Sequence, residues 1–375
     1  MSEVKKKVCI LGWYGTETLG DRAILDGILS VFYQTYGKCD FFIGSLYPFF
    51  TERTVYEDGA VYKGSAPNCR ITIFDVKERM AEYIKESDMV IMGGGPIMEL
   101  DLLYLIYRGF KIAKSCNKKT VVLGCGMGPL KSRRLIGVAK KIITIADLVI
   151  FRDEESLKYA NRLTNGRYQF YALDDPAVIS MQQYRGFSKG AEREAYLAIN
   201  VREPDHHYPK MSENIEGDFV KLIKKACEQY ERVKLVPMHT FQVGKDDRKY
   251  MTRLASAADC RNLEVLHKPL SLYELYEVYQ KAQACIGMRY HSVVMQTLLN
   301  GNNYILDYTE KEKGKISGFI NMLKRPDFYA DRYVSIVSEA LDPEACLKVI
   351  SRKKYYEYDG LEKEIERYGE LLNLL

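Results

Sequence analysis

Basic side chains follow the apolar, strand-like runs in the second half of the chain. Arg202, His239 and Arg289 each come directly after such a run. His291 opens the next helical segment, and Lys313 follows a fourth run. The carboxyl ends of parallel strands meet at one edge of a sheet, so these side chains are expected to converge. Arginine suits a carboxylate or phosphate, and histidine suits an anion or proton transfer. The pattern predicts a site for a small, multiply charged anion, although each residue alone could belong to a structural ion pair.

Three glycine-rich loops follow strand-like runs in the first half of the chain, at residues 12–21, 93–96 and 124–129. Glycine lets the backbone approach a ligand, and a helix N-terminus that follows it offers amides to an anion. The loops match neither a Walker motif nor a dinucleotide fingerprint. One such loop is commonly only a tight turn, but three at successive strand ends favour a binding site. Substrate contacts are expected at Gly94, Gly95 and Gly126.

Strand-like and helix-like segments alternate along almost the whole chain, and these elements must position the loops. The strands are continuously apolar, which is typical of parallel sheets covered on both faces. The polar stretch 182–194 indicates a linker. The sequence thus predicts an α/β protein with two doubly wound, Rossmann-like domains, residues 1–181 and 195–350, that face a cleft. Residues 351–375 hold an amphipathic helix, expected to pack on the protein, with membrane docking as the alternative.

The composition excludes several classes of protein. Hydrophobic residues make up 47% and charged residues 28%, which is ordinary for a globular protein. The net charge of +5 comes in short clusters, so no nucleic-acid partner is expected. The start is unlike a signal peptide, and the nine cysteines indicate buried thiols in a reducing compartment. No metal site is expected, because the pair His206-His207 has no third ligand at a fitting spacing. We expect a cytoplasmic protein, peripheral to the inner face of the membrane at most.

The loops and strand ends together carry a family resemblance. The chain resembles the polysaccharide pyruvyl transferase family, and seven segments occur in the family's order from about residue 8 to residue 315. Thr18 and Arg22 depart from the pattern, since relatives often have Asn and Glu there. The segments are GWYGTETLGDRAIL (12–25), MGGGP (92–96), GCGMGPL (124–130), FRDEES (151–156), DDPA (174–177), NVREP (200–204) and MRYHSVVMQ (288–296).

The resemblance implies a fold similar to that of the GT-B glycosyltransferases. It also implies transfer of a pyruvyl group from phosphoenolpyruvate to two hydroxyls of a sugar, which forms a cyclic ketal and releases phosphate. Such sugars are commonly lipid-linked precursors of capsular or exopolysaccharides. Phosphoenolpyruvate is the donor substrate, and no cofactor is implied. By the resemblance, Arg289 and His291 belong to the donor-binding and catalytic motif, and Arg202 is a second donor arginine.

Asp21 is the candidate on the acceptor side. It follows Gly20 at the start of the first helix, where the helix dipole favours a carboxylate, so a purely structural role is an equal alternative. In the functional reading, Asp21 orients the sugar hydroxyl or takes its proton, because the cations of the other domain serve the donor. Glu17 is the nearest competing carboxylate in the same loop.

Two other functions remain open at this stage. A GT-B glycosyltransferase would use the same loops and place the arginines on the diphosphate of a nucleotide sugar. The second is a carbohydrate- or anion-binding module that catalyses no reaction, and such a module would give the cluster of arginines and histidines no role. The acceptor sugar, the ketal positions and the oligomeric state cannot be derived from the sequence.

Overall fold

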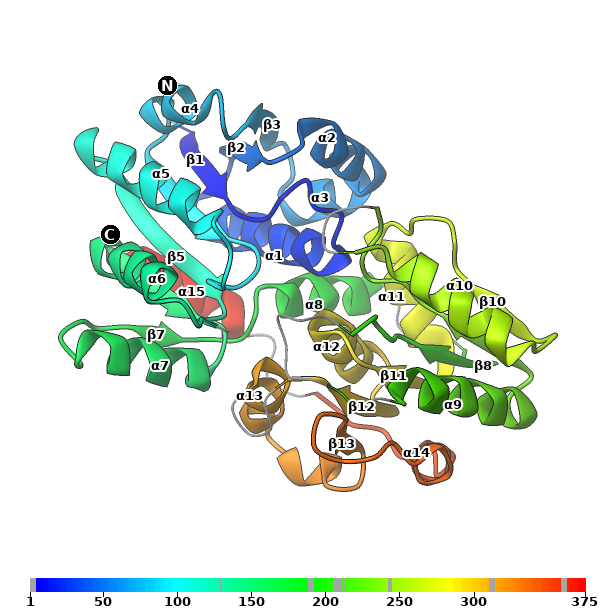
Figure 1. Cartoon of the computed structure of the whole chain (residues 1–375). Coiled ribbons are helices and arrows are strands. Elements are labelled where there is room, and N and C mark those ends of the chain that lie inside the picture. Colours follow the sequence, from blue (N-terminus) through cyan, green and yellow to red (C-terminus); the bar gives the residue numbers. More distant parts are fainter. Residues whose placement is uncertain are drawn as a thin grey trace. The chain divides into compact units, whose positions relative to one another are not determined.

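The computed structural model describes residues 5–128, 130–187, 192–204, 211, 214–241, 245–309, 314–358 and 363–375, with the backbone alone at 185–187. The chain divides into two compact units (Figure 1). Unit 1 holds Met1–Gln183 and Gly360–Leu375, and unit 2 holds Tyr184–Asp359. The boundary falls inside a helix, Ala177–Phe187, so the expected linker 182–194 begins within helical residues.

Unit 1 is built on a seven-stranded, all-parallel sheet with the order β3-β2-β1-β4-β5-β6-β7. The order reverses between β1 and β4, which places a topological switch point beyond their carboxyl ends. The loops after these two strands are the first two glycine-rich loops. The strands are β1 (Lys6–Leu11), β2 (Cys39–Ser45), β3 (Arg70–Asp75), β4 (Met89–Gly93), β5 (Lys119–Cys125), β6 (Leu148–Phe151) and β7 (Tyr171–Ala172).

Helices cover this sheet, and several begin at a capping side chain. Ser132 accepts a hydrogen bond from the Leu135 N–H, and Asp153 accepts one from the Ser156 N–H, which satisfies helix N–H groups that have no partner in the helix. The helices are α1 (Leu19–Tyr36), α2 (Pro48–Glu57), α3 (Gly59–Ser65), α4 (Met80–Glu86), α5 (Leu103–Ser115), α6 (Arg133–Ile145), α7 (Glu154–Thr164), α8 (Ala177–Phe187) and α15 (Glu364–Leu372).

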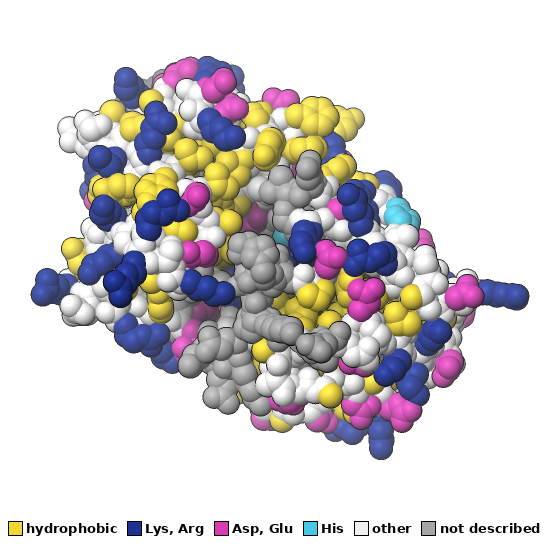
Figure 2. Space-filling view, in the orientation of Figure 1, with side chains coloured by type: hydrophobic (Ala, Val, Ile, Leu, Met, Phe, Trp, Pro, Cys, Tyr) yellow, Lys and Arg dark blue, Asp and Glu magenta, His cyan; other side chains and the backbone are white. Residues whose placement is uncertain are grey.

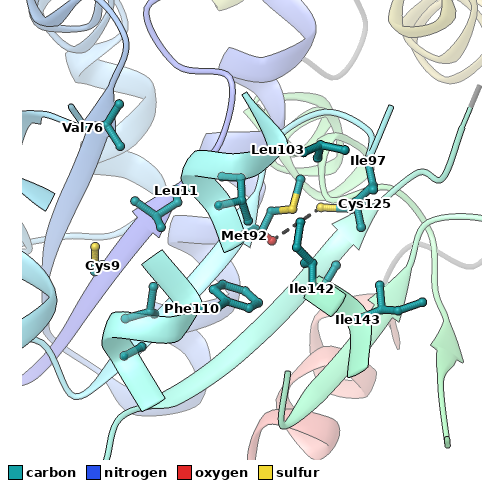
Figure 3. Packing of buried hydrophobic residues seen from close by; sticks show 14 of the residues in the cluster. Cys9, Leu11, Val76, Met92, Ile97, Leu103, Phe110, Cys125, Ile142 and Ile143 are labelled. Atoms are coloured by element: carbon teal, nitrogen blue, oxygen red, sulfur yellow. Dashed lines mark hydrogen bonds between the residues drawn. The ribbon is translucent and has the colours of Figure 1, made fainter. Parts of the chain in front are cut away.

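The hydrophobic core of unit 1 lies between this sheet and its helices (Figure 3). Leu11 and Met92, from the adjacent strands β1 and β4, belong to one buried cluster with Phe110 of α5 and Ile142 of α6. The thiol of Cys125 donates to the Met92 carbonyl at 3.5 Å. The buried, apolar strands therefore fix the positions of their carboxyl ends, and with them the points at which the glycine-rich loops begin.

Unit 2 repeats the plan with a six-stranded, all-parallel sheet in the order β10-β9-β8-β11-β12-β13. Its switch point lies between β8 and β11. The strands are β8 (Glu194–Ile199), β9 (Arg232–Leu235), β10 (Leu263–Val265), β11 (Ala282–Gly287), β12 (Asn303–Asp307) and β13 (Tyr333–Ser335). The helices are α9 (Ile215–Gln229), α10 (Asp247–Ala258), α11 (Leu272–Lys281), α12 (Tyr290–Leu299), α13 (Lys315–Met322), the 3-10 turn η1 (Pro326–Tyr329) and α14 (Pro343–Ile350).

The predicted fold class, two parallel-sheet α/β units, is confirmed. The amphipathic C-terminal helix expected within 351–375 is α15, and it packs on unit 1. Its Tyr368 and Leu372 are buried, and the Tyr368 hydroxyl donates to the Asp174 carbonyl at 2.7 Å. All nine cysteines are free thiols. Within the described ranges, no helix combines the length and the apolar character that crossing a membrane requires.

The surface carries charges of both signs. Figure 2 shows Lys and Arg side chains intermixed with Asp and Glu on the visible face of each unit, and hydrophobic side chains gathered where α2 lies. Phe49 and Tyr56 of α2 are 70% and 88% exposed. The described part of this face therefore has no dense basic stripe.

Candidate active site

Arg289 lies two residues after β11, at the N-cap of α12, where a buried carboxylate holds it. Its Nε donates to Asp247 at 2.7 Å, and its Nη2 donates to the other oxygen of the same carboxylate. Asp247, the first residue of α10, also accepts from the backbone N–H groups of Met238 and His239 at 3.1 and 3.0 Å. Asp247 thus ties Arg289 to the end of β9. The guanidinium edge formed by Nη1 and Nη2 is the one that an anion would use.

Asn200 fixes the backbone of Arg289. This fully buried side chain follows β8, accepts from the Arg289 N–H at 3.0 Å and donates to the Val236 carbonyl at 2.8 Å. It therefore links three neighbouring strand ends, those of β8, β9 and β11. Asn200 and Asp247 were not among the residues predicted from the sequence.

Arg202 and Lys315 lie on the ring of Tyr308, the residue that follows β12. The Arg202 guanidinium carbon is 4.9 Å and the Lys315 Nζ is 5.4 Å from the ring centroid. Tyr308 is only 1% exposed. Burial by itself raises the pKa of Tyr308, but Lys315, Arg202 and Arg289 together outweigh it and lower the pKa to about 8. Cations from the ends of β8 and β11 and from the start of α13 therefore gather around one hydroxyl.

The two predicted histidines follow β9 and β11, the strands on either side of β8. His291 is half-buried in the first turn of α12, with its ring edge-on to that of Tyr290 at 4.9 Å. His239 follows β9, and its carbonyl accepts from the Asp247 N–H at 3.1 Å. Lys313 lies outside the described residues, as does the pair His206-His207. Lys315, from the same run of lysines, is described and lies in this cluster.

In unit 1, the first two glycine loops hold an aromatic pair. Gly94 and Gly95 have φ values of +97° and +75°. A Cβ on Gly94 would lie 2.9 Å from the Tyr14 hydroxyl, and one on Gly95 would lie 2.1 Å from Trp13 Cδ1. Both positions therefore need glycine for the backbone conformation and for the contact with an aromatic ring. Their predicted role in binding substrate stays a prediction.

Residues 13–18 line a pocket together with Asp21, Arg22 and Leu25 of α1 and with Thr51 and Thr54 of α2. Among the described residues, neither the Tyr14 hydroxyl nor Oε1 of Glu17 has a hydrogen-bond partner, although both are buried. Glu17 holds a φ of +59°, which is strained for this residue type. Burial raises its pKa, although Arg53, which donates to Oε2, opposes this shift.

Asp21 lines the same pocket and takes part in capping α1. The Thr18 side chain accepts from the Asp21 N–H at 3.2 Å, and the Thr18 hydroxyl donates to the Asp21 carboxylate. These hydrogen bonds account for a purely structural, capping role of Asp21. Its position in the pocket is the basis for a role in the chemistry. Arg22 forms an ion pair with the buried Asp58 at 2.7 Å.

Gly126, the third predicted glycine contact, is explained by packing. A Cβ there would lie 2.8 Å from Nε and Nη2 of Arg152. Arg152 pairs with Asp175 at 3.0 Å, and both side chains are about 2% exposed. The missing side chain makes room for this buried pair, so a role in substrate binding is still only a prediction. Among the residues that the structure describes, no three His, Cys, Asp or Glu side chains form a group that could hold a metal ion.

Several solved structures resemble the chain over 99% of its length. One is UDP-GlcNAc 2-epimerase from Neisseria meningitidis bound to UDP-GlcNAc, with a TM-score of 0.59, 10% identity and 100% of that chain covered. Another is UDP-GlcNAc 2-epimerase from Methanocaldococcus jannaschii, with a TM-score of 0.62, 12% identity and 100% of that chain covered. A third is a Glycyrrhiza uralensis protein complexed with glycyrrhetinic acid 3-O-monoglucuronide, with a TM-score of 0.56, 8% identity and 97% of that chain covered. At such identities the likeness shows the fold alone, and it is the GT-B-like fold expected from the sequence.

No curated protein matches the chain in sequence. The family model of polysaccharide pyruvyl transferase matches residues 19–310, from the start of α1 to just beyond β12. This range covers well over half of the chain and includes Asp21, at the start of α1, and the residues Arg202 and Arg289 that follow β8 and β11. The chain belongs to the polysaccharide pyruvyl transferase family.

Proposed function

We propose that the protein transfers the pyruvyl group of phosphoenolpyruvate to two hydroxyls of a sugar in a lipid-linked polysaccharide precursor. The observation that carries the proposal is the contact of Arg202 and Lys315 with the ring of Tyr308, whose pKa Arg289 also lowers. Phosphoenolpyruvate bears a carboxylate and a phosphate close together, so it suits a compact cluster of cations.

The chemistry needs a proton, a clamp for phosphate and a base. A proton delivered to the methylene carbon of the donor leaves an oxocarbenium-like centre at C2. One sugar hydroxyl attacks C2, phosphate leaves, and the second hydroxyl closes the ketal. Of the two hydroxyl protons, one replaces the proton given to the methylene carbon and the other leaves with phosphate. Acid–base help of this kind contributes roughly 100- to 10,000-fold, and cations on the departing phosphate add electrostatic stabilisation.

In this proposal the cations of unit 2 bind the donor, and His291 supplies the proton or stabilises the phosphate. The N-terminus of α12, where His291 lies, favours an anion through its amides and dipole. His239, at the end of β9, is assigned to the same donor group, and so is Lys313.

The acceptor is assigned to the pocket of unit 1. Trp13 and Tyr14 offer aromatic surface, and Asp21 offers a carboxylate that can orient a hydroxyl or take its proton. The Tyr14 hydroxyl and Glu17 Oε1 are buried polar atoms of the kind that a sugar hydroxyl satisfies. The proposal places the protein in the cytoplasm, at or near the inner membrane face where a lipid-linked acceptor is presented.

Thermal protection separates this function from a nucleotide-sugar glycosyltransferase. Phosphoenolpyruvate is expected to raise the melting temperature, because a ligand that binds only the folded state stabilises it. UDP and GDP are expected to leave the melting temperature unchanged. Protection by a nucleotide but not by phosphoenolpyruvate would replace the proposal with the glycosyltransferase.

A further inference from the structure

Tyr308 is buried among cations and has no role in the chemistry described so far. It follows β12 directly, and two side chains lie against its ring, Arg202 from the end of β8 and Lys315 from the first position of α13. Lys315 also forms a hydrogen bond with its hydroxyl. Three separate segments thus contribute positive charge to one phenol group, with Arg289 as the third cation.

Two carboxylates of the described residues beside this cluster, those of Asp307 and Asp247, are bound to other partners. Asp307 accepts from the Thr309 N–H at 2.7 Å and from the Tyr333 hydroxyl at 2.8 Å. Asp247 is held by the side chain of Arg289 and by two backbone N–H groups. Among the described residues, Tyr290, whose ring centroid is 6.0 Å from Lys315 Nζ, and its neighbour His291 are further titratable side chains beside the cluster.

We propose that the Tyr308 hydroxyl is a titrating part of the anion site, which gives up its proton among the cations at alkaline pH when no anion is bound and retains it when one is bound. In the empty site, Lys315 and Arg202 stabilise the phenolate. A bound dianion neutralises the same cations, so the phenolate loses its support and takes up a proton. Tyr308 then offers an O–H where the empty site has a negative charge. It acts as a positioning residue, and the proposal depends on the proposed function only for the identity of the anion.

Because binding of an anion and protonation of Tyr308 are linked, the affinity for the anion depends on pH. The pKa of Tyr308 is about 8 in the empty site. Below that pH the group is already protonated, and binding of an anion moves no proton. Above it, binding must be accompanied by uptake of one proton, so the affinity falls by up to about tenfold per pH unit.

Calorimetry with two anions tests the proposal. Sulfate keeps its charge across the range, and phosphoenolpyruvate is the proposed donor. For the unchanged protein, both dissociation constants are expected to rise roughly tenfold between about pH 7 and pH 9. Tyr308→Phe removes the phenol and should flatten the profile. Tyr304→Phe changes the same strand, but burial raises the pKa of Tyr304, so this variant should keep the profile.

Proton uptake in the unchanged protein gives a second measurement that does not depend on a variant folding. Titrations in two buffers of different ionisation enthalpy should show nearly one proton taken up per anion at pH 9 and nearly none at pH 7. No uptake at pH 9, or an equal loss of affinity in Tyr308→Phe, overturns the proposal.

The two anions keep the inference and the proposed function apart. Proton-coupled binding of sulfate without binding of phosphoenolpyruvate would retain the role of Tyr308 and reject the donor. Binding of phosphoenolpyruvate with no proton uptake would retain the donor and reject the role of Tyr308. If neither anion binds at any pH, both are rejected.

Discussion

The carboxylate of Asp247 binds the guanidinium of Arg289 along one edge, with Nε 2.7 Å from its oxygen, while both side chains are almost completely buried. The pair joins the start of α10 to the start of α12, across the ends of β9, β8 and β11. It fixes the orientation of the second guanidinium edge before any ligand arrives, which lowers the entropic cost of binding an anion.

Arg289→Ala is expected to abolish binding of phosphoenolpyruvate. Arg289→Lys should also bind poorly, because an ammonium cannot engage Asp247 and an anion through two planar edges. Calorimetric titration of each variant measures the effect. Arg232→Ala is the matched control, since Arg232 forms an exposed pair with Glu194 on the same sheet and should leave the affinity unchanged. Unchanged affinity in Arg289→Ala would contradict the assignment of the donor site.

His291→Ala should fold normally and lose at least about 100-fold in turnover if His291 moves a proton. His291 is only half-buried, which makes a large loss of stability unexpected. The control is His267→Ala, which removes an exposed histidine of the same unit. Activity close to that of the unchanged protein, with an unchanged melting temperature, would remove His291 from the mechanism.

Asp21→Asn separates the capping role of Asp21 from the chemical one. Asparagine keeps the hydrogen-bonding shape beside Thr18 but removes the negative charge. If Asp21 acts on the acceptor, turnover falls while donor affinity and melting temperature hardly change. Glu17→Gln is the companion variant, because Glu17 lines the same pocket. A loss of turnover in Glu17→Gln but not in Asp21→Asn would transfer the role to Glu17, and a loss of stability alone in Asp21→Asn would leave Asp21 a capping residue.

Asp26 of α1 predicts a pH dependence of stability. It is fully buried, and burial raises its pKa from 3.8 to about 7, although Ser180 and Ser65 oppose the shift. Between these pH values the folded protein retains a proton that the unfolded chain has lost, so stability is highest at the acid end and falls as pH rises to about 7. The whole effect is about 4 kcal/mol.

Denaturant unfolding at several pH values measures this effect. Asp26→Asn cannot titrate and should lose this slope, so that its stability relative to the unchanged protein improves as pH rises. Asp101→Asn, which changes an exposed carboxylate of the same unit, should retain the slope. Parallel slopes for Asp26→Asn and the unchanged protein would show that Asp26 is not the group responsible.

The strands and the residues directly after them could be predicted from the sequence, because a continuous apolar run followed by Arg202 or Arg289 is a local pattern. Asp247 could not be assigned, since in the sequence it is one of two acidic residues at a helix start, 42 positions before its partner. Only the strand order brings the two together. In the sequence Tyr308 only follows an apolar run, and the cations on its ring come from two other segments.

The glycines, too, have contacts with distant side chains that the sequence does not show. Gly94 and Gly95 look like ligand-binding loop residues, yet Trp13 and Tyr14 occupy the space beside them. Gly126 is required by the Arg152 guanidinium, and a sequence does not show which distant side chain fills a given space. The sequence shows Glu17 only as a second carboxylate in the loop, and the structure adds its positive φ and its Oε1 atom without a hydrogen-bond partner.

Mass spectrometry tests the central claim most directly. Candidate lipid-linked oligosaccharides are incubated with the protein and phosphoenolpyruvate, and with the Arg289→Ala variant as the control. We predict a product whose mass has increased by one pyruvyl ketal, with one phosphate released per product, and none with the variant. A sugar transferred from a nucleotide sugar to the same acceptors, with no pyruvylated product from any of them, would contradict the account.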